Sequence, residues 1–403
     1  MKIALFFDLP SGGAKRTVYE QVKRLSARHQ LDLFTLSTAN QDFADVRPFV
    51  RHVQVAAFDP LPLARSPLGR LNAAIRVIDI LRLRRVMRSL ALAINAGRYD
   101  VALIHPCQTT FSPSILRFLA VPSLYYRHDL VRWLHDWPVE RPYDRHTSWC
   151  DGLNAVDPLR ATYRWLLLSE DRVSMQAATR VVTNSCFMRE SLYRIYGVAP
   201  HLCYHGVDVS LFRPLQQERR GFVLSVGMLV PAKGYDFVIQ SLACIPVRQR
   251  PPLIIVSNTS QEQEALYLQQ IAERLVVQVT FKSMVSDEEL VDLYNQAACT
   301  VYAPVMESFG LVPLESMACG TPVVGIREGG VRETVVHEQT GLLADRDPEQ
   351  FASAICRLLD NPGLCEKMGK QARTYVERYW TWEQAVARLE VYLQGTARCP
   401  KRE

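Results

Sequence analysis

The sequence contains no apolar stretch long enough to cross a membrane. A spanning helix needs about 18 or more consecutive apolar residues, and the chain has no such run. Its opening holds one lysine and the short apolar run Ile3–Phe7, which is too short for a signal peptide and is followed by a turn rather than by a cleavage site. We therefore expect neither an integral membrane protein nor a secreted one, and we expect the chain in the cytoplasm.

Cysteine is present but is not grouped. The ten cysteines are scattered from Cys107 to Cys399 without a C-x-x-C pair, whereas a metal cluster or a disulfide framework needs closely spaced thiols. We expect free thiols in a reducing compartment. The chain also lacks short repeats, low-complexity tracts and the G-x-x-x-x-G-K-[ST] pattern of a P-loop, so any phosphate-binding loop must be of another kind.

The composition is that of a globular protein whose charge is unevenly distributed. Of the 403 residues, 48% are hydrophobic and 22% are charged, and this length predicts two or three domains. Residues 1–200 carry 27 Lys and Arg against 17 Asp and Glu, a net +10, and the remainder carries 20 against 24, a net −4. This asymmetry predicts two domains with different partners; the basic half could face an anionic lipid surface, a phosphorylated ligand or nucleic acid.

Strands and helices alternate along both halves. Apolar runs predict strands at 3–7, 31–36, 53–58, 101–105, 123–126 and 180–185, the last of which closes the first series. The pattern restarts with strands at 222–227, 253–257, 279–282, 300–303 and 322–326, separated by helices at about 234–245, 261–274, 286–298 and 311–319. Such alternation predicts right-handed crossovers and parallel sheets. We expect an α/β protein of two doubly wound domains joined near residues 206–220.

Two stretches interrupt the first domain. Between residues 65 and 98 there are eight arginines and one acid, with an apolar side formed by Ile75, Ile78, Leu81 and Val86. This stretch is either a basic helix lying on an anionic membrane or a solvated helix that covers the sheet. Residues 133–165 hold four of the six tryptophans, which could form an aromatic acceptor site or a membrane-edge loop, or could be ordinary packing.

Three loops at the carboxyl ends of predicted strands contain the residues best suited to chemistry, because open α/β sheets bind ligands at that edge. In the first, Gly12 and Gly13 precede a helix, so backbone N–H groups can approach a phosphate, although the pair is also an ordinary tight turn. The second ends in Lys233, which can neutralise a diphosphate. The third is the strongest signal. Glu307 lies in the loop, and Glu315, about one turn inside the next helix, can accept hydrogen bonds from two vicinal hydroxyls, as in ribose binding.

In their order along the chain these motifs resemble those of the retaining nucleotide-sugar glycosyltransferases of family 4, and the resemblance covers nearly the whole sequence. The matching segments are Gly12-Gly13, Tyr126-Arg127-His128-Asp129, Thr183-Asn184-Ser185, His205-Gly206-Val207-Asp208 with Phe212 and Pro214, Gly227 to Gly234, the Glu307/Glu315 block, Gly329-Gly330 with Glu333, and Thr340-Gly341-Leu342-Leu343. The resemblance implies the glycosyltransferase-B (GT-B) fold, with two Rossmann-like domains facing each other across a cleft. Residues 1–208 would bind the acceptor and residues 209–382 the donor, and a C-terminal helix at about 383–398 would pack back on the first domain.

The resemblance also implies roles for single residues. Glu307 would contact the donor sugar, Lys233 would hold the diphosphate, and His128 would lie beside the sugar at the reaction centre; these three form the predicted catalytic set. Glu315 would bind the nucleotide ribose. The remaining predicted donor-binding residues are Gly12, Gly13, Ser308, Phe309, Gly310 and Leu311.

One position departs from the family pattern. The residue after the strand-end glycine is commonly an arginine that binds the diphosphate, and here it is Met228. We predict that Lys15 or Arg16 replaces the missing cation. No carboxylate in the matching motifs is placed as an obvious nucleophile, so we expect front-face attack with retention of configuration, in which the departing phosphate takes the acceptor's proton.

No metal or other cofactor is expected, and the donor substrate would be a nucleotide sugar such as a UDP- or GDP-sugar. Asp345-Arg346-Asp347 has the D-x-D form of metal sites in other glycosyltransferases. However, Asp347 precedes Pro348 at a predicted helix start, where a helix N-cap is the better interpretation.

The sequence therefore predicts sugar transfer from a nucleotide-diphosphate sugar to an acceptor hydroxyl, in cell-envelope polysaccharide or glycolipid biosynthesis. The basic first domain favours a glycan or lipid-linked acceptor and peripheral contact with an anionic membrane on its cytoplasmic face. Nucleic acid is not an expected partner, because no recognition motif is present. Two alternatives stay open, namely an inactive sugar-nucleotide-binding scaffold, favoured by Met228, and a sugar-nucleotide epimerase of the same fold.

Overall fold

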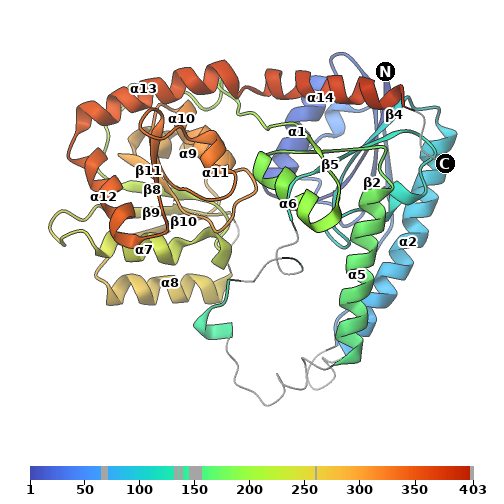
Figure 1. The fold of residues 1–403 in the computed structure, drawn as a ribbon, viewed down its shortest axis with the longest axis horizontal. Helices are drawn as coiled ribbons and strands as arrows, with labels where there is room; N and C mark the ends of the chain where they lie inside the picture. Colours follow the sequence, from blue (N-terminus) through green and yellow to red (C-terminus); the bar gives the residue numbers. More distant parts are fainter. Residues whose placement is uncertain (65–70, 131–134, 136–138, 145–156, 259–260, 400–403) are drawn as a thin grey trace.

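The computed structural model describes residues 1–403 except 65–70, 131–134, 136–138, 145–156, 259–260 and 400–403. The chain forms two α/β domains side by side, each with a parallel sheet between layers of helices (Figure 1). The predicted fold class, two doubly wound parallel-sheet domains, is confirmed. In the described part of the chain no helix is both long enough and apolar enough to span a membrane.

The first domain is built on a sheet with strand order β3-β2-β1-β4-β5-β6-β7. The interior strand β1 pairs in parallel with β2 and β4, with Leu5 opposite Leu33 and Leu103. The β1 residues Ile3–Phe7 are fully buried, as is typical of a parallel strand covered on both faces. The elements are β1 (Lys2–Asp8), α1 (Gly13–Leu25), β2 (Gln30–Leu36), η1 (Arg47–Phe49), β3 (His52–Ala56), α2 (Asn72–Ala96), β4 (Val101–Cys107), η3 (Ser114–Arg117), β5 (Ser123–Arg127), η4 (Pro142–Asp144), α5 (Pro158–Gln176), β6 (Arg180–Thr183), α6 (Cys186–Tyr196) and β7 (His201–Leu202).

The second domain repeats this design with the strand order β10-β9-β8-β11-β12-β13. Its apolar core gathers side chains from the sheet and from helices on one face, among them Val238, Leu268, Val301 and Ile355. The elements are β8 (Val223–Val226), η5 (Pro231–Lys233), α7 (Tyr235–Ala243), β9 (Leu253–Val256), α8 (Glu262–Arg274), β10 (Val279–Lys282), α9 (Asp287–Gln296), β11 (Cys299–Tyr302), α10 (Leu311–Ala318), β12 (Val323–Ile326), α11 (Val331–Thr334), β13 (Gly341–Ala344), α12 (Pro348–Leu359), α13 (Pro362–Tyr379) and α14 (Trp382–Ala397).

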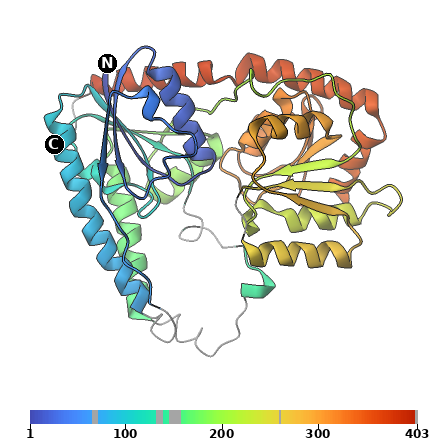
Figure 2. The same cartoon turned by 180° about the vertical axis from the view of Figure 1, so that it is seen from behind.

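Two of the connections between the domains lie next to each other. The chain first passes from β7 to β8, and it returns where α13 of the second domain is followed by α14, which lies on the first domain (Figures 1 and 2). The crossings touch each other, since the Val207 N–H donates to the Trp380 carbonyl at 2.8 Å. On α14, Val386, Leu389 and Leu393 are buried in the cluster that contains the α1 core residues. The division at residue 208 stays a prediction.

The predicted strands are present, with boundaries shifted by a few residues. Each sheet also contains one strand that was not predicted from the sequence. The first series does not close with β6, because β7 pairs beside it, and β13 adds a sixth strand to the second sheet. Both missed strands are edge strands of two and four residues. Segments this short show little alternation of apolar and polar residues. They are recognised as strands only from their pairing with a neighbouring strand.

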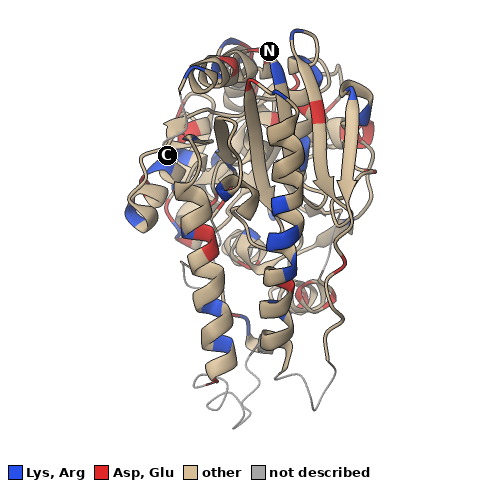
Figure 3. Cartoon of the chain, turned by 90° about the vertical axis from the view of Figure 1, so that its right-hand side faces the viewer, with Lys and Arg blue, Asp and Glu red and all other residues tan. Residues whose placement is uncertain are grey.

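Residues 72–96 of the arginine-rich stretch form α2, which packs beside α5 and extends with it beyond the sheet (Figure 3). The side that the sequence pattern assigned as apolar is buried only in part, since Val86 packs against the core and Ile75 is half-buried. Leu83, Met87 and Ile94 are buried against the sheet, whereas Ile78 and Leu81 are exposed by 47% and 45%. Three of the four tryptophans predicted as an aromatic site, at positions 133, 137 and 149, lie outside the described residues.

Candidate functional site

The loop after β11 places Glu307 next to Lys233. Lys233 Nζ donates to Glu307 Oε2 at 2.6 Å, and these side chains are only 18% and 15% exposed. The two residues are 74 positions apart in sequence and were predicted for different parts of the donor, the diphosphate and the sugar. The fold thus brings the predicted cation and the predicted carboxylate into one ion pair.

Two glycines at the end of β12 fix the backbone of this loop. The Gly330 N–H donates to the Glu307 carbonyl at 2.7 Å. A Cβ on Gly329 would lie 2.4 Å from the Glu307 carbonyl oxygen, and a Cβ on Gly330 would lie 2.5 Å from that of Ser308. Side chains cannot be accommodated at such distances, so the close packing that holds Glu307 in place requires glycine at both positions.

Lys233 is held by the short turn η5. Its neighbour Gly234 has φ +67°, and a Cβ there would lie 2.2 Å from the Ala303 carbonyl oxygen. The Val305 N–H donates to the Ala232 carbonyl at 2.9 Å. The turn with Lys233 and the loop with Glu307 are therefore bonded through their backbones, and displacement of one would displace the other.

Glu315 lies on α10, one turn beyond the loop. Tyr294 Oη donates to Glu315 Oε2 at 2.9 Å. Burial raises the pKa of Glu315, whereas the positive charge of Arg16 and the Tyr294 hydrogen bond oppose that rise. Arg16 belongs to the first domain, so a cation from one domain acts on a carboxylate of the other. The first N–H groups of α10, beginning at Leu311, have no partners within the helix and favour an anion.

The loop Gly12-Gly13 faces the start of α10. A Cβ on Gly13 would lie 3.5 Å from Cδ1 of Leu311, so two predicted donor-binding segments from different domains are adjacent. The structure also separates the two candidate replacement cations. Arg16 donates to Asp287 Oδ1 of α9 at 2.7 Å, whereas Lys15 is buried with Nζ 3.9 Å from the centre of the Phe7 ring.

The surroundings of Lys15 and Met228 help to decide which cation could replace the arginine that the family commonly has at position 228. Burial lowers the pKa of Lys15 to about 8, with Asp45 opposing and Arg47 reinforcing the effect. Met228 is 47% exposed and presents no charge. Arg16 is therefore the cation that points toward the donor domain, and Lys15 is turned into its own domain.

His128 lies at the end of β5 in a buried stack of rings. Its Nε2 lies 2.9 Å from His105 Nδ1, and its ring stacks on Tyr126 and His205 with centroids 4.7 and 5.5 Å away. Burial, reinforced by the charge of Arg127, lowers the pKa of His128 to about 3. The imidazole is thus neutral at physiological pH, and it can donate or accept a hydrogen bond but does not supply a charge.

The residues around His128 also join the domains, a role the sequence did not reveal. Ser308 Oγ donates to Asp129, and Ser185 Oγ donates to the Ser308 carbonyl at 2.5 Å. Glu333 of α11 accepts the N–H groups of Cys186 and Phe187, at 2.8 and 2.9 Å, and so caps α6 of the opposite domain. Asp129, Ser185, Ser308 and Glu333 stand in the matched segments, but nothing in a linear motif shows which segments meet.

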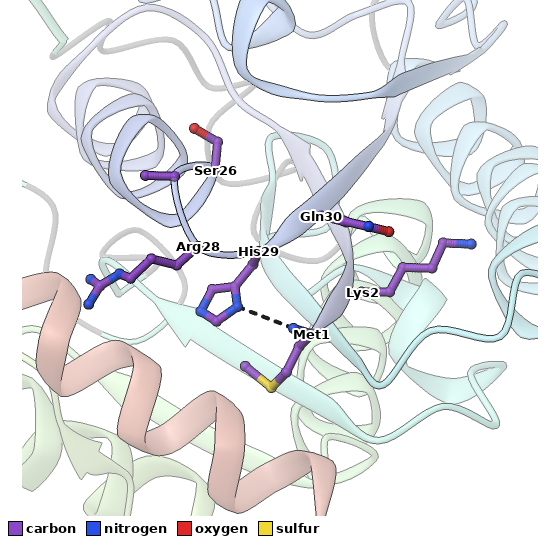
Figure 4. A pocket seen from close by; sticks show the side chains of 7 residues that line it. Met1, Lys2, Ser26, Arg28, His29 and Gln30 are labelled. Atoms are coloured by element: carbon purple, nitrogen blue, oxygen red, sulfur yellow. Dashed lines mark hydrogen bonds between the residues drawn. The ribbon is translucent and has the colours of Figure 1, made fainter.

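The D-x-D segment lies at the start of α12. Asp347 Oδ1 accepts the Gln350 N–H at 2.8 Å and caps α12, as the sequence interpretation held. Among the described residues no group of three or more His, Cys, Asp or Glu side chains could hold a metal ion. A shallow hollow of about 470 Å³ lined by Met1, Lys2 and residues 26–30 (Figure 4) lies at the start of β1, at the edge opposite the candidate site.

Comparison with known proteins decides the family. Residues 11–211 match the model for Glycosyltransferase Family 4, and residues 209–375 match the model for Glycosyl transferases group 1. A D-inositol 3-phosphate glycosyltransferase from Acidothermus cellulolyticus is 36% identical over 93% of this chain and 84% of its own length. D-inositol 3-phosphate glycosyltransferase 2 from Catenulispora acidiphila is 32% identical over 95% and 90%. The chain belongs to glycosyltransferase family 4.

Solved structures show that this family 4 glycosyltransferase has the GT-B fold. Sucrose-phosphate synthase from Thermosynechococcus elongatus superposes with a TM-score of 0.73 at 22% identity, covering 99% of this chain and all of the other. HepE from Anabaena, in complex with UDP and glucose, superposes with a TM-score of 0.72 at 18% identity over 98% and 99% of the two chains. The family models and the similar glycosyltransferases support the transferase activity expected from the resemblance. The roles of single residues stay predictions.

Proposed function

We propose that this glycosyltransferase transfers a sugar from a nucleotide-diphosphate sugar to an acceptor hydroxyl with retention of configuration. The Lys233–Glu307 ion pair, next to the start of α10, is the observation that carries the proposal. A cation beside helical N–H groups suits a diphosphate, and a carboxylate suits sugar hydroxyls. That HepE binds UDP, and in another structure UDP-glucose, supports the same class of donor.

The surroundings of the ionisable groups favour front-face attack. Lys233 pairs with Glu307 and so lowers the nucleophilicity of that carboxylate. Burial leaves His128 uncharged, a state that suits hydrogen bonding to the sugar. Lys233 and the N–H groups of α10 would stabilise the charge of the departing diphosphate. His128 would hold the sugar, and the leaving phosphate would accept the proton of the attacking hydroxyl.

We further propose that the acceptor is an envelope glycan or a lipid-linked precursor reached at an anionic membrane. The exposed side of α2 combines Ile78, Leu81 and Leu92 with Arg85 and Arg88, and such a mixture binds the interface of an anionic bilayer. Co-sedimentation with anionic vesicles at low salt should fall for Arg85→Glu/Arg88→Glu. It should not fall for the control Lys367→Glu/Lys370→Glu on α13, and equal binding of both variants would contradict the membrane contact.

Calorimetric titration with UDP, GDP and ADP, without added metal, tests the donor site. We expect micromolar binding of one nucleotide, lost in Glu315→Ala and kept in Glu289→Ala, an exposed glutamate of the same domain. Turnover would then be assayed with D-inositol 3-phosphate, the acceptor in the relatives' names, and with lipid-linked glycans. A nucleotide that binds without turnover on any acceptor would favour the inactive scaffold, and a product of inverted configuration by NMR would refute retention.

A further inference from the structure

A segment of the first domain docks on the second domain beside the turn that carries Lys233. Residues 139–144 follow β5 in the chain, yet in space they lie against α8, where Figure 1 shows them as a teal segment directly below that helix. Arg141 of this segment is 4% exposed. Its side chain donates hydrogen bonds to Pro231, Asp236 and Glu264, all in the donor domain.

The Arg141 guanidinium engages two carboxylates at once. Nη1 and Nη2 donate to the two oxygens of Asp236 at 2.7 and 3.0 Å, and Nε and Nη2 donate to those of Glu264 at 3.1 and 2.9 Å. Its charge lies 5.2 Å from the centre of the Tyr267 ring. Tyr143 adds a 2.5 Å hydrogen bond to Glu264. Bidentate hydrogen bonds to two carboxylates fix both the position and the orientation of the guanidinium. The ammonium group of a lysine cannot pair in this way.

The third partner of Arg141 connects this anchor to the donor site. Nη2 donates to the Pro231 carbonyl at 3.2 Å, and Pro231 opens the three-residue turn η5 that ends in Lys233. Asp236 lies in the first turn of α7, directly after the same turn. The guanidinium therefore binds the chain on both sides of Lys233, through the Pro231 carbonyl before it and the Asp236 carboxylate after it. The Ala232–Val305 hydrogen bond adds a third attachment of the same turn.

We propose that Arg141 is a positioning residue for the diphosphate-binding lysine. By fixing η5 from outside, it keeps Lys233 directed at Glu307 and at the phosphates of the donor. The anchor comes from the acceptor-side domain, so donor binding depends on where this segment docks. The inference rests on the proposed function, since it assumes that Lys233 binds a diphosphate.

A purely structural role is the competing explanation. Glu264 is fully buried, so losing its cation leaves an unpaired buried charge and destabilises the domain. Such destabilisation would weaken every nucleotide alike. Misplacement of Lys233 would instead weaken the binding of nucleotides that carry a second phosphate and leave the binding of those without one unchanged.

The test compares UDP with UMP on Arg141→Lys, Asp236→Asn and Lys233→Met, with the melting temperature of each variant recorded. Arg250→Lys is the matched control, because Arg250 also makes five hydrogen bonds in this domain, all to backbone carbonyls away from η5. We expect Arg141→Lys to weaken UDP about tenfold, the size of one charge-assisted hydrogen bond. UMP should change by less than about twofold, and Asp236→Asn should show the same pattern with a smaller loss.

Each result supports or overturns the inference. A UDP-selective loss in Arg141→Lys but not in Arg250→Lys supports it. An equal loss of UDP and UMP, or an unchanged UDP affinity while Lys233→Met weakens UDP, overturns it and leaves the proposed function intact. If the wild-type protein binds no nucleotide, the proposed function fails and the inference fails with it.

Discussion

Glu307→Gln should separate nucleotide binding from sugar transfer. In the structure Lys233 is occupied by the Glu307 carboxylate at 2.6 Å, so an incoming diphosphate must share this cation with Glu307. The glutamine keeps the size and the hydrogen-bonding capacity of the side chain but removes its charge. We therefore expect Glu307→Gln to bind UDP more tightly than the wild type does, while transferring sugar more slowly.

The size of the expected change in UDP affinity follows from the surroundings of the Lys233–Glu307 ion pair. Two unit charges about 4 Å apart interact by about 4 kcal/mol at an effective dielectric constant of about 20. Solvent and salt reduce the interaction energy of partly exposed ion pairs to about 1 kcal/mol. Since 15–18% of these side chains is exposed, we use this lower value. Removing the competing carboxylate should then tighten UDP by about 1 kcal/mol, roughly fivefold. Losing the charged hydrogen bond to the sugar should slow turnover by about 10- to 100-fold.

Calorimetry with UDP and steady-state kinetics with the nucleotide sugar measure the two effects. Lys233→Met should change UDP affinity in the opposite direction, weakening it about tenfold. Glu289→Gln is the control, since it removes a glutamate paired with an exposed lysine at 2.8 Å in the same domain and should change neither quantity. Weaker UDP binding by Glu307→Gln would refute the competition argument.

Three further predictions concern the contacts between and within the domains. Glu333→Gln should lower the free energy of unfolding in urea by about 1 kcal/mol, because the charged cap of α6 is lost; an unchanged value would contradict the capping role. Arg16→Met should weaken UDP about fivefold by calorimetry, whereas Lys15→Met should leave UDP binding within about twofold; a larger effect of Lys15 would reverse the assignment. Burial and the charge of Arg127 lower the pKa of His128 from 6.5 to about 3, so the unfolded chain binds more protons below pH 6.5. As the pH falls from 6.5 to 5, the free energy of unfolding should therefore decrease, and its slope for this group should approach about 1.4 kcal/mol per pH unit. His128→Asn should flatten that pH dependence in urea titrations, and an unchanged slope would show that the histidine does not cause it.

Local pattern accounts for most of the fold. Buried apolar runs such as Ile3–Phe7 predict parallel strands, because strands covered on both faces are apolar throughout. The pattern failed where an element is too short to have a period, as in β7, and where a helix exposes apolar side chains. On α2 the sequence pattern predicted an apolar side that included Ile78 and Leu81, whereas packing against the sheet and α5 buries Ile80 and Leu83 and leaves Ile78 and Leu81 exposed.

The sequence by itself determined the alternation of strands and helices, the tandem of two domains and the identity of the loops at the strand ends, because each depends on residues close together in the chain. The tertiary structure decided which of those loops meet. The pairing of Lys233 with Glu307, the capping of α6 by Glu333 and the docking of Arg141 join residues 74 to 147 positions apart. Such contacts depend on how two sheets are placed relative to each other, and no periodicity within one segment contains that information.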